Sequence, residues 1–223
     1  MNFIVKATSK DNLINLINDV DDLNTIDTGL ITDMSCMFSF ATNFNKPLDR
    51  WDVSNVVDMQ DMFNCAYNFN QTLNEWDVSS VSYMQHMFEN TYNFNQPLND
   101  WDVSNVSNMQ DMFRFAKKFS KPLNEWDVSN VENACSMFNS AESFFSDLNR
   151  WDVSNIKNAD EMFMNAHRYN GSMKKWNFKS LTHEPKDFMK NCYAWKLYNN
   201  NDDMPLYKDK RLSNGFKCVI NIM

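Results

Sequence analysis

Hydrophobic residues recur along the chain in a fixed order, with single polar residues between them. In five successive copies, a leucine stands three positions before a tryptophan and a valine two positions after it, as in Leu73, Trp76 and Val78. In an extended chain, Trp76 and Val78 point to one side and Asp77 points to the other. Burying a row of unpaired carboxylates would be too costly for a small domain. The pattern therefore predicts a short strand whose Trp and Val side faces the core.

After this strand the hydrophobic spacing changes to three or four residues. The positions are Val56, Met59, Met62, Phe63 and Ala66. This spacing predicts an amphipathic helix of about three turns. Ser54 or Asn55 precedes it with a short polar side chain that can accept hydrogen bonds from the first turn. A return segment with an aromatic residue, and in three copies a proline that cannot continue a helix, completes the unit.

The whole unit repeats every 25 residues, which is clearest in the tryptophans. They are Trp51, Trp76, Trp101, Trp126, Trp151 and Trp176. A more divergent copy, LNTIDTGLI, precedes Trp51 and makes seven copies. A fixed period of this length is typical of stacked repeat proteins, and the L-x-x-W-x-V spacing is that of a leucine-rich-repeat strand. We expect an α/β fold, a right-handed leucine-rich-repeat-like solenoid of about seven coils, each with a short parallel strand and a helix.

Two columns of equivalent residues predict how neighbouring coils match. The column of Met59 changes to alanine at Ala134 and Ala159, so we expect the later helices to lie closer to the sheet. Asn45, Asn70 and Asn95 occupy another column. Because an asparagine side chain both donates and accepts, this column predicts a hydrogen-bonded ladder between coils.

Both ends of the array carry sequences that can cap it. Phe3, Ile4 and Val5 predict a strand, and Thr8 or Ser9 can begin a helix after it. That helix has one apolar face, formed by Leu13, Leu16, Ile17 and Val20. At the other end, alternation at Phe216, Cys218, Ile220 and Ile222 predicts a final strand. The expected divisions are an N-terminal cap over 1–22, the repeats over 23–190 and a C-terminal cap over 191–223.

The repeat unit FNQPLNDWDVSNVSNMQDMF and the entry segment IDTGLITDMSCMF closely resemble the BspA-like leucine-rich repeat family of surface proteins and lipoproteins. The resemblance covers roughly residues 23–190. It implies a leucine-rich-repeat solenoid and a role in adhesion or protein binding, at the cell surface or after secretion, and it brings no catalytic residue. The chain begins without a recognisable signal peptide, so the compartment stays open.

Charge divides the chain into two unequal parts. Residues 1–167 hold 10 basic and 24 acidic side chains, whereas residues 168–223 hold 11 basic and 5 acidic ones. The strongly acidic part, residues 1–167, would repel a phosphate backbone, so we expect no nucleic-acid partner. The basic end is interpreted as a solvated cap, with docking of an acidic partner or another copy as the alternative. No apolar stretch approaches the length of a membrane span.

Candidate chemistry is sparse. The five cysteines form no C-x-x-C pair and the three histidines are scattered, so we expect reduced structural thiols, no metal site and no cofactor. His86 is interpreted as an exposed side chain. No repeat gathers a nucleophile, a base and oxyanion donors, so an enzyme is not expected. The row of aspartates from Asp52 to Asp152 could hold calcium, but we expect hydrogen bonds within the protein to satisfy it.

These observations favour a non-enzymatic interaction or adhesion module that binds a protein or polymer on its strand face. Specificity is expected where exposed positions vary most in charge beside an otherwise constant face. The predicted contact residues are Asp49, Arg50, Asn74, Glu75, Asn99, Asp100, Asn124, Glu125, Arg150 and Lys175. The alternatives are a purely structural or assembly module, and cation binding along the aspartate row.

Overall fold

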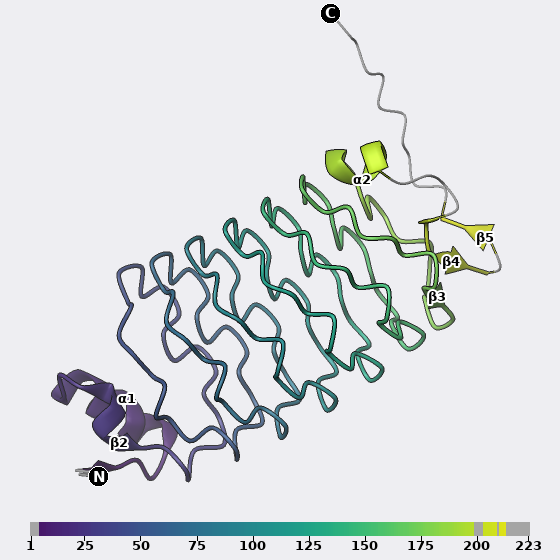
Figure 1. Cartoon of the computed structure of the whole chain (residues 1–223). Coiled ribbons are helices and arrows are strands. Elements are labelled where there is room, and N and C mark those ends of the chain that lie inside the picture. Colours follow the sequence, from purple (N-terminus) through teal and green to yellow (C-terminus); the bar gives the residue numbers. More distant parts are fainter. Residues whose placement is uncertain (1–4, 199–202, 209, 213–223) are drawn as a thin grey trace, which may run out of the picture.

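Successive repeats lie side by side in one continuous stack, with the first and the last of the described helices at its opposite ends (Figure 1). The computed structural model describes residues 5–198, 203–208 and 210–212. Single-residue parallel bridges join equivalent positions of neighbouring repeats, from Asp33 with Asp58 to Asn133 with Asn158. The 25-residue period of the sequence is therefore the period of the stack.

The N-terminal end is closed by a strand and a helix. Strand β1 (Val5–Lys6) pairs in parallel with β2 (Ile26–Asp27), and helix α1 (Lys10–Asp19) lies between them in the sequence, before the short 3-10 helix η1 (Leu23–Thr25). The Ser9 hydroxyl accepts a hydrogen bond from the Asn12 amide at 3.2 Å and so caps α1. Leu13 is buried and the other apolar residues of this face pack against the core. The predicted N-terminal helix is confirmed.

The C-terminal end carries a small mixed sheet. Strand β3 (Asn177–Phe178) pairs in parallel with β4 (Leu206–Tyr207), which pairs antiparallel with β5 (Lys210–Arg211). Helix α2 (Tyr193–Tyr198) precedes β4 in the sequence. The final strand expected at Phe216–Ile222 lies outside the described residues.

The expected α/β architecture is wrong. Between β2 and β3 the chain forms no helix and no strand longer than the single-residue bridges. Between β2 and β3, the L-x-x-W-x-V segments form no β-ladder with their neighbours. The residue that forms the bridge, such as Asp58, lies instead in the segment predicted to be helical. The predicted solenoid of strand-plus-helix coils, with its leucine-rich-repeat strand, is therefore replaced by stacked irregular repeats.

The backbone amides explain why no helix forms. Alternate residues donate to the next repeat, as Met59 does to the Tyr83 carbonyl at 3.0 Å and Phe63 to the Met87 carbonyl at 3.0 Å. The residues between them close tight turns, because Met62 donates to the Met59 carbonyl three positions back at 3.2 Å. Half of the amides that a helix needs are thus committed to a neighbouring repeat.

These turns also require a left-handed backbone at two places in each repeat. Asp61 has φ 56° and Cys65 has φ 59°, and equivalent residues in the other repeats take the same conformation. Residues of this kind cannot continue a right-handed helix. The apolar positions themselves were predicted correctly, since Val56, Met59 and Ala66 are fully buried. The spacing identified the buried residues and not the backbone that carries them.

The core is built from columns of aromatic rings. The rings of Phe63 and Phe88, equivalent residues of adjacent repeats, stack with centroids 5.7 Å apart, and Phe63 stacks on Phe69 of its own repeat at 4.0 Å. Each repeat tryptophan is buried, and the indole of Trp76 donates to the Leu48 carbonyl of the preceding repeat at 3.0 Å. The predicted inner face is confirmed.

The asparagine column forms the predicted ladder. The Asn45 side-chain oxygen accepts from the Asn70 amide at 2.9 Å, and that of Asn70 accepts from the Asn95 amide at 2.9 Å. The donors are backbone N–H groups, so each side chain fixes the register of the next repeat. The expected shift of helices beside Ala134 and Ala159 does not occur, because these alanines lie in the same non-helical turns as the methionines.

Candidate functional site

The predicted contact residues lie in two adjacent columns that run along the stack, immediately before the buried tryptophans. The outer column is exposed in every repeat. We call it the charged row; it consists of Arg50, Glu75, Asp100, Glu125, Arg150 and Lys175. The inner column is less accessible, because its asparagines are only partly exposed. It consists of Asp49, Asn74, Asn99, Asn124, Asn149 and Lys174.

The inner column holds the charged row in register. The side-chain oxygen of Asn99 accepts from the Glu125 amide at 3.2 Å, and that of Asn149 accepts from the Lys175 amide at 3.4 Å. Asn24, one repeat earlier, accepts from the Arg50 amide at 3.2 Å. The oxygens of Asn24, Asn99 and Asn149 are thus used inside the protein. Asn74 and Asn124 instead donate from their side-chain amides, Asn74 to Asp100 Oδ2 at 3.0 Å and Asn124 to Glu125.

The contacts within the charged row are weak. Arg150 approaches Glu125 with 3.4 Å between Nη1 and Oε1, and their side chains are 75% and 55% exposed. An ion pair this exposed contributes at most about 1 kcal/mol. Arg150 can therefore exchange Glu125 for a carboxylate of another molecule at little cost.

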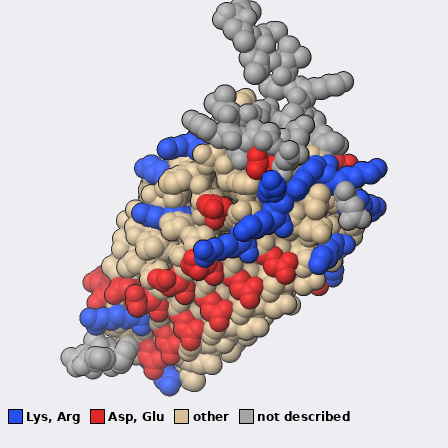
Figure 2. Space-filling view, turned by 45° about the vertical axis from the view of Figure 1, so that its right-hand side comes forward, with Lys and Arg blue, Asp and Glu red and all other residues tan. Residues whose placement is uncertain are grey.

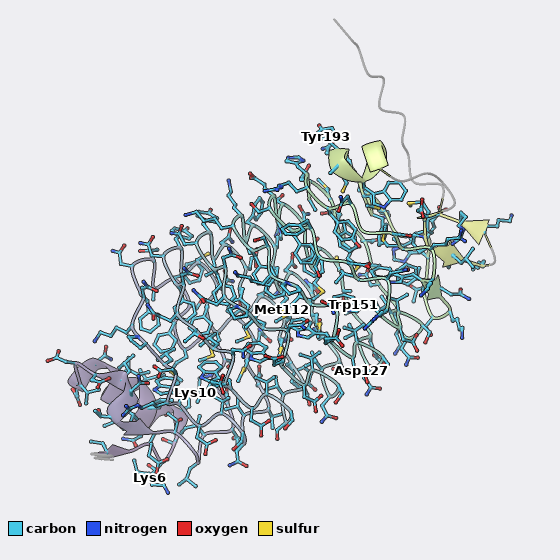
Figure 3. The ribbon with its side chains drawn as sticks, viewed as in Figure 1. Lys6, Lys10, Met112, Asp127, Trp151 and Tyr193 are labelled. Atoms are coloured by element: carbon cyan, nitrogen blue, oxygen red, sulfur yellow. The ribbon has the colours of Figure 1, made fainter. Side chains whose placement is uncertain are left out.

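The aspartate row next to the tryptophans is satisfied internally, as predicted. One oxygen of Asp77 accepts from the Ser79 amide at 3.1 Å and also from the Ser79 hydroxyl at 2.6 Å. The hydroxyl and the amide of Ser79 lower the pKa of Asp77 below its usual value. Figure 3 shows Asp127 of this row at the outer edge of the stack and Trp151 within it. No three metal-ligating side chains converge anywhere in the described part of the chain.

A cavity of about 450 Å³ opens at the C-terminal end of the charged row. We call it the end pocket. Its lining includes side chains from two successive repeats, and four of them are charged. These four are Arg150, Asp152, Lys175 and Lys179. The sequence pattern singled out Arg150 and Lys175 but not Asp152 or Lys179 as contact residues.

The basic end of the molecule lies next to the last repeat. The Arg211 guanidinium donates from Nη1 to the carbonyls of Lys174 at 3.1 Å and Met204 at 2.6 Å, so β5 is fastened beside the last repeat. Lys208, Lys210 and Arg211 line a second cavity of about 310 Å³. Figure 2 shows Asp and Glu side chains in rows along the body of the stack and Lys and Arg gathered towards this end.

The expectation that His86 is an exposed side chain is wrong. His86 is partly buried, with its Nδ1 at 2.7 Å from Glu89 Oε2 and 3.8 Å from Asp111 Oδ2. The hydrogen bond with Glu89 raises the pKa of His86, and burial raises the pKa of Asp111. His86 and Asp111 are 25 residues apart and so occupy equivalent positions of adjacent repeats. Interpreting His86 as a surface side chain missed the contact, because stacking places equivalent residues beside one another.

No disulfide joins two cysteines of the described residues. These cysteines are Cys36, Cys65, Cys135 and Cys192; Cys218 lies outside those residues. Burial raises the pKa of the Cys36, Cys65 and Cys135 thiols, so they are poorly suited to act as nucleophiles. Across the described segments, no helix is both long and apolar enough to cross a bilayer.

Comparison with known families corrects one expectation from the sequence. No curated protein and no solved structure is significantly similar to the chain. One family model matches it twice, over residues 8–123 and 98–200, and this family is described as "Mycoplasma protein of unknown function, DUF285". The match is not to the BspA-like leucine-rich repeat family, so the assignment from resemblance was wrong. With nearly all of the repeat array matched, the chain belongs to the DUF285 family.

Proposed function

We propose that this protein is a non-enzymatic interaction module that binds a protein or polymer partner along the charged row. The observation that carries the proposal is the row itself: exposed side chains of changing charge, one per repeat, on a backbone fixed by the inner column. A partner meets a linear pattern of charges at a spacing of about 5 Å, close to that of neighbouring strands. Complementary charges placed in this way select a partner more than they add affinity.

The rigidity of the row favours this function over a merely solvated surface. Binding costs less when the contact groups are already ordered. The Glu125 and Lys175 backbones are held by Asn99 and Asn149 respectively. Only the outer part of each charged side chain remains to be ordered by a partner.

The proposal is tested by photo-crosslinking in an extract of the native source. A photoreactive residue is placed at Glu75 or Glu125 in the row, and at the exposed Lys117 outside it as the matched control. We expect the two row positions to capture the same partner and Lys117 to capture none. Capture should disappear in a chain neutralised at every charged-row position before Lys175, namely Arg50, Glu75, Asp100, Glu125 and Arg150.

Two results would reject the proposal. One is equal capture at Lys117, and the other is unchanged capture after the row is neutralised. Unchanged capture would favour a purely structural or assembly module, because such a module has no need of these charges.

A further inference from the structure

The end pocket contains cations that the protein itself leaves unpaired. In the described parts of the chain, neither Lys175 nor Lys179 has a carboxylate within ion-pair distance. The third cation, Arg150, has only its exposed contact with Glu125. Three positive side chains and one carboxylate, that of Asp152, thus line one open cavity, which keeps an excess of positive charge.

The pocket forms where the last repeat departs from the others. Earlier repeats carry aspartate and serine at the second and fourth positions of the W-D-V-S segment, as in Asp152 and Ser154. The last repeat has Asn177 and Lys179 at these places. One negative charge is lost and one positive charge is gained on the same surface. The row of acidic side chains therefore ends at a basic pocket.

We propose that the end pocket binds the carboxylates of an acidic stretch in an extended polypeptide, whose following basic residues lie along Glu125, Asp100 and Glu75. This inference rests on the proposed function and names the partner's chemistry. Glu125 already shows that a carboxylate can approach the Arg150 guanidinium. The three acidic positions span two repeats, about 10 Å, which three or four residues of an extended peptide cover.

The charges around the pocket favour a polypeptide over a phosphate chain. Asp152 lines the pocket, and the amide and hydroxyl of Ser154, together with the Lys179 ammonium, lower its pKa, so it is ionised at neutral pH. A phosphate backbone would carry its negative charge past the pocket and along the acidic part of the row. A peptide can change its charge from acidic to basic where the protein changes from basic to acidic.

The test is fluorescence anisotropy with a labelled peptide of three glutamates, one glycine and three lysines, made in both chain directions. The pocket variant is Lys175→Gln with Lys179→Gln. The control, Lys117→Gln with Lys118→Gln, removes the same charge from exposed positions outside the pocket. We expect the pocket variant to bind about tenfold more weakly than the wild type, and the control to change affinity less than about twofold.

Two further probes decide between the alternatives. A peptide of alternating glutamate and lysine should bind the wild type about tenfold more weakly than the block peptide, because only the block pattern matches the row. Equal binding of the two peptides, equal losses in the two double variants, or tighter binding of a single-stranded oligonucleotide would each overturn the inference. If one of these results is obtained but crosslinking along the charged row persists, the proposed function stands. Only the inference that the end pocket binds carboxylates is then wrong. If the charged row captures no partner but binding of the block peptide is still weakened by Lys175→Gln with Lys179→Gln, the proposed function is wrong.

Discussion

Each repeat tryptophan contributes to the stack both by packing and by a hydrogen bond. The Trp101 side chain is only 3% exposed, and its indole N–H donates to the Leu73 carbonyl of the preceding repeat at 3.0 Å. One side chain therefore fills the core and fixes the register of two repeats. Asp102, one residue later, is exposed and accepts from the Ser104 amide at 3.0 Å within its own repeat.

Trp101→Ala should lower the free energy of unfolding by about 3–5 kcal/mol, because it opens a cavity in the core. Trp101→Phe, which keeps most of the ring but leaves the Leu73 carbonyl without its donor, should cost about 1–3 kcal/mol. Asp102→Ala should cost at most about 1–2 kcal/mol. Urea unfolding measures all three variants. A greater loss in Asp102→Ala than in Trp101→Ala would invert the assignment of the inner face.

Bulky residues in the left-handed conformation are a second feature at this scale. Phe40 has φ 60° and its side chain is 72% exposed, so it accepts backbone strain without burying much apolar surface. Asparagine tolerates this conformation better. Phe40→Asn should therefore raise the free energy of unfolding by about 0.5–1 kcal/mol. Leu30→Asn is the control, because Leu30 is also exposed but does not have a positive φ. An equal rise in the free energy of unfolding for Leu30→Asn would show that backbone strain is not the cause.

At the scale of one element, the turn-forming segment of each repeat shows the limit of sequence periodicity. Apolar residues three and four positions apart are buried in it, as they would be in an amphipathic helix. The same spacing also suits consecutive tight turns whose alternate amides bond to the next repeat. This arrangement places polar side chains of adjacent repeats beside one another, and His86 beside Asp111 is one result.

The His86 cluster makes stability depend on pH. The folded-state pKa of His86 lies above its usual value near 6.5, mainly through Glu89. Its contribution is therefore fully present below about pH 6.5 and is lost as pH rises through the folded pKa. We expect the wild type to lose unfolding free energy between pH 6 and pH 8.5 relative to His86→Asn, whose asparagine suits φ 59°. Urea titrations at both pH values measure this, and parallel profiles of the two proteins would contradict it.

At the scale of the whole molecule, charge is distributed along the stack rather than around a centre. The body carries a net charge of 10 − 24 = −14 over residues 1–167, and residues 168–223 carry 11 − 5 = +6. The structure sets the basic end directly after the rows of acidic side chains (Figure 2). A partner of matching charge order would approach in a preferred orientation, and this preference would weaken as salt is added.

The regular row of aspartates should nevertheless be indifferent to calcium. A cation that bound only the folded protein would raise its melting temperature by mass action. The row carboxylates accept from serine groups of their own repeats, as Asp102 does from Ser104. We expect no shift in melting temperature at millimolar calcium, measured by differential scanning calorimetry. A rise of several degrees that Asp102→Asn abolishes would show that the row binds the ion.

The sequence by itself determined the 25-residue period, the buried tryptophan and valine face, the asparagine ladder and the N-terminal helix. Each follows from a local rule: a carboxylate such as Asp77 is too costly to bury, and a serine such as Ser9 caps a helix. The domain limits, the absence of an enzymatic role and the partner-binding function stay predictions.

Only the tertiary structure decided the backbone path and the end pocket. A backbone amide such as that of Phe63 can donate within its own segment or to the next repeat, and the sequence pattern of apolar residues is the same in both cases. Which carbonyl accepts from the amide depends on whether a neighbouring repeat is stacked beside it. Likewise, Asp152 and Lys179 belong to successive repeats and are about one period apart in the chain. They line one cavity because the repeat that contains β3 stacks on the preceding repeat. Periodicity records which residues are buried, whereas hydrogen-bond partners and pockets arise only when the repeats meet.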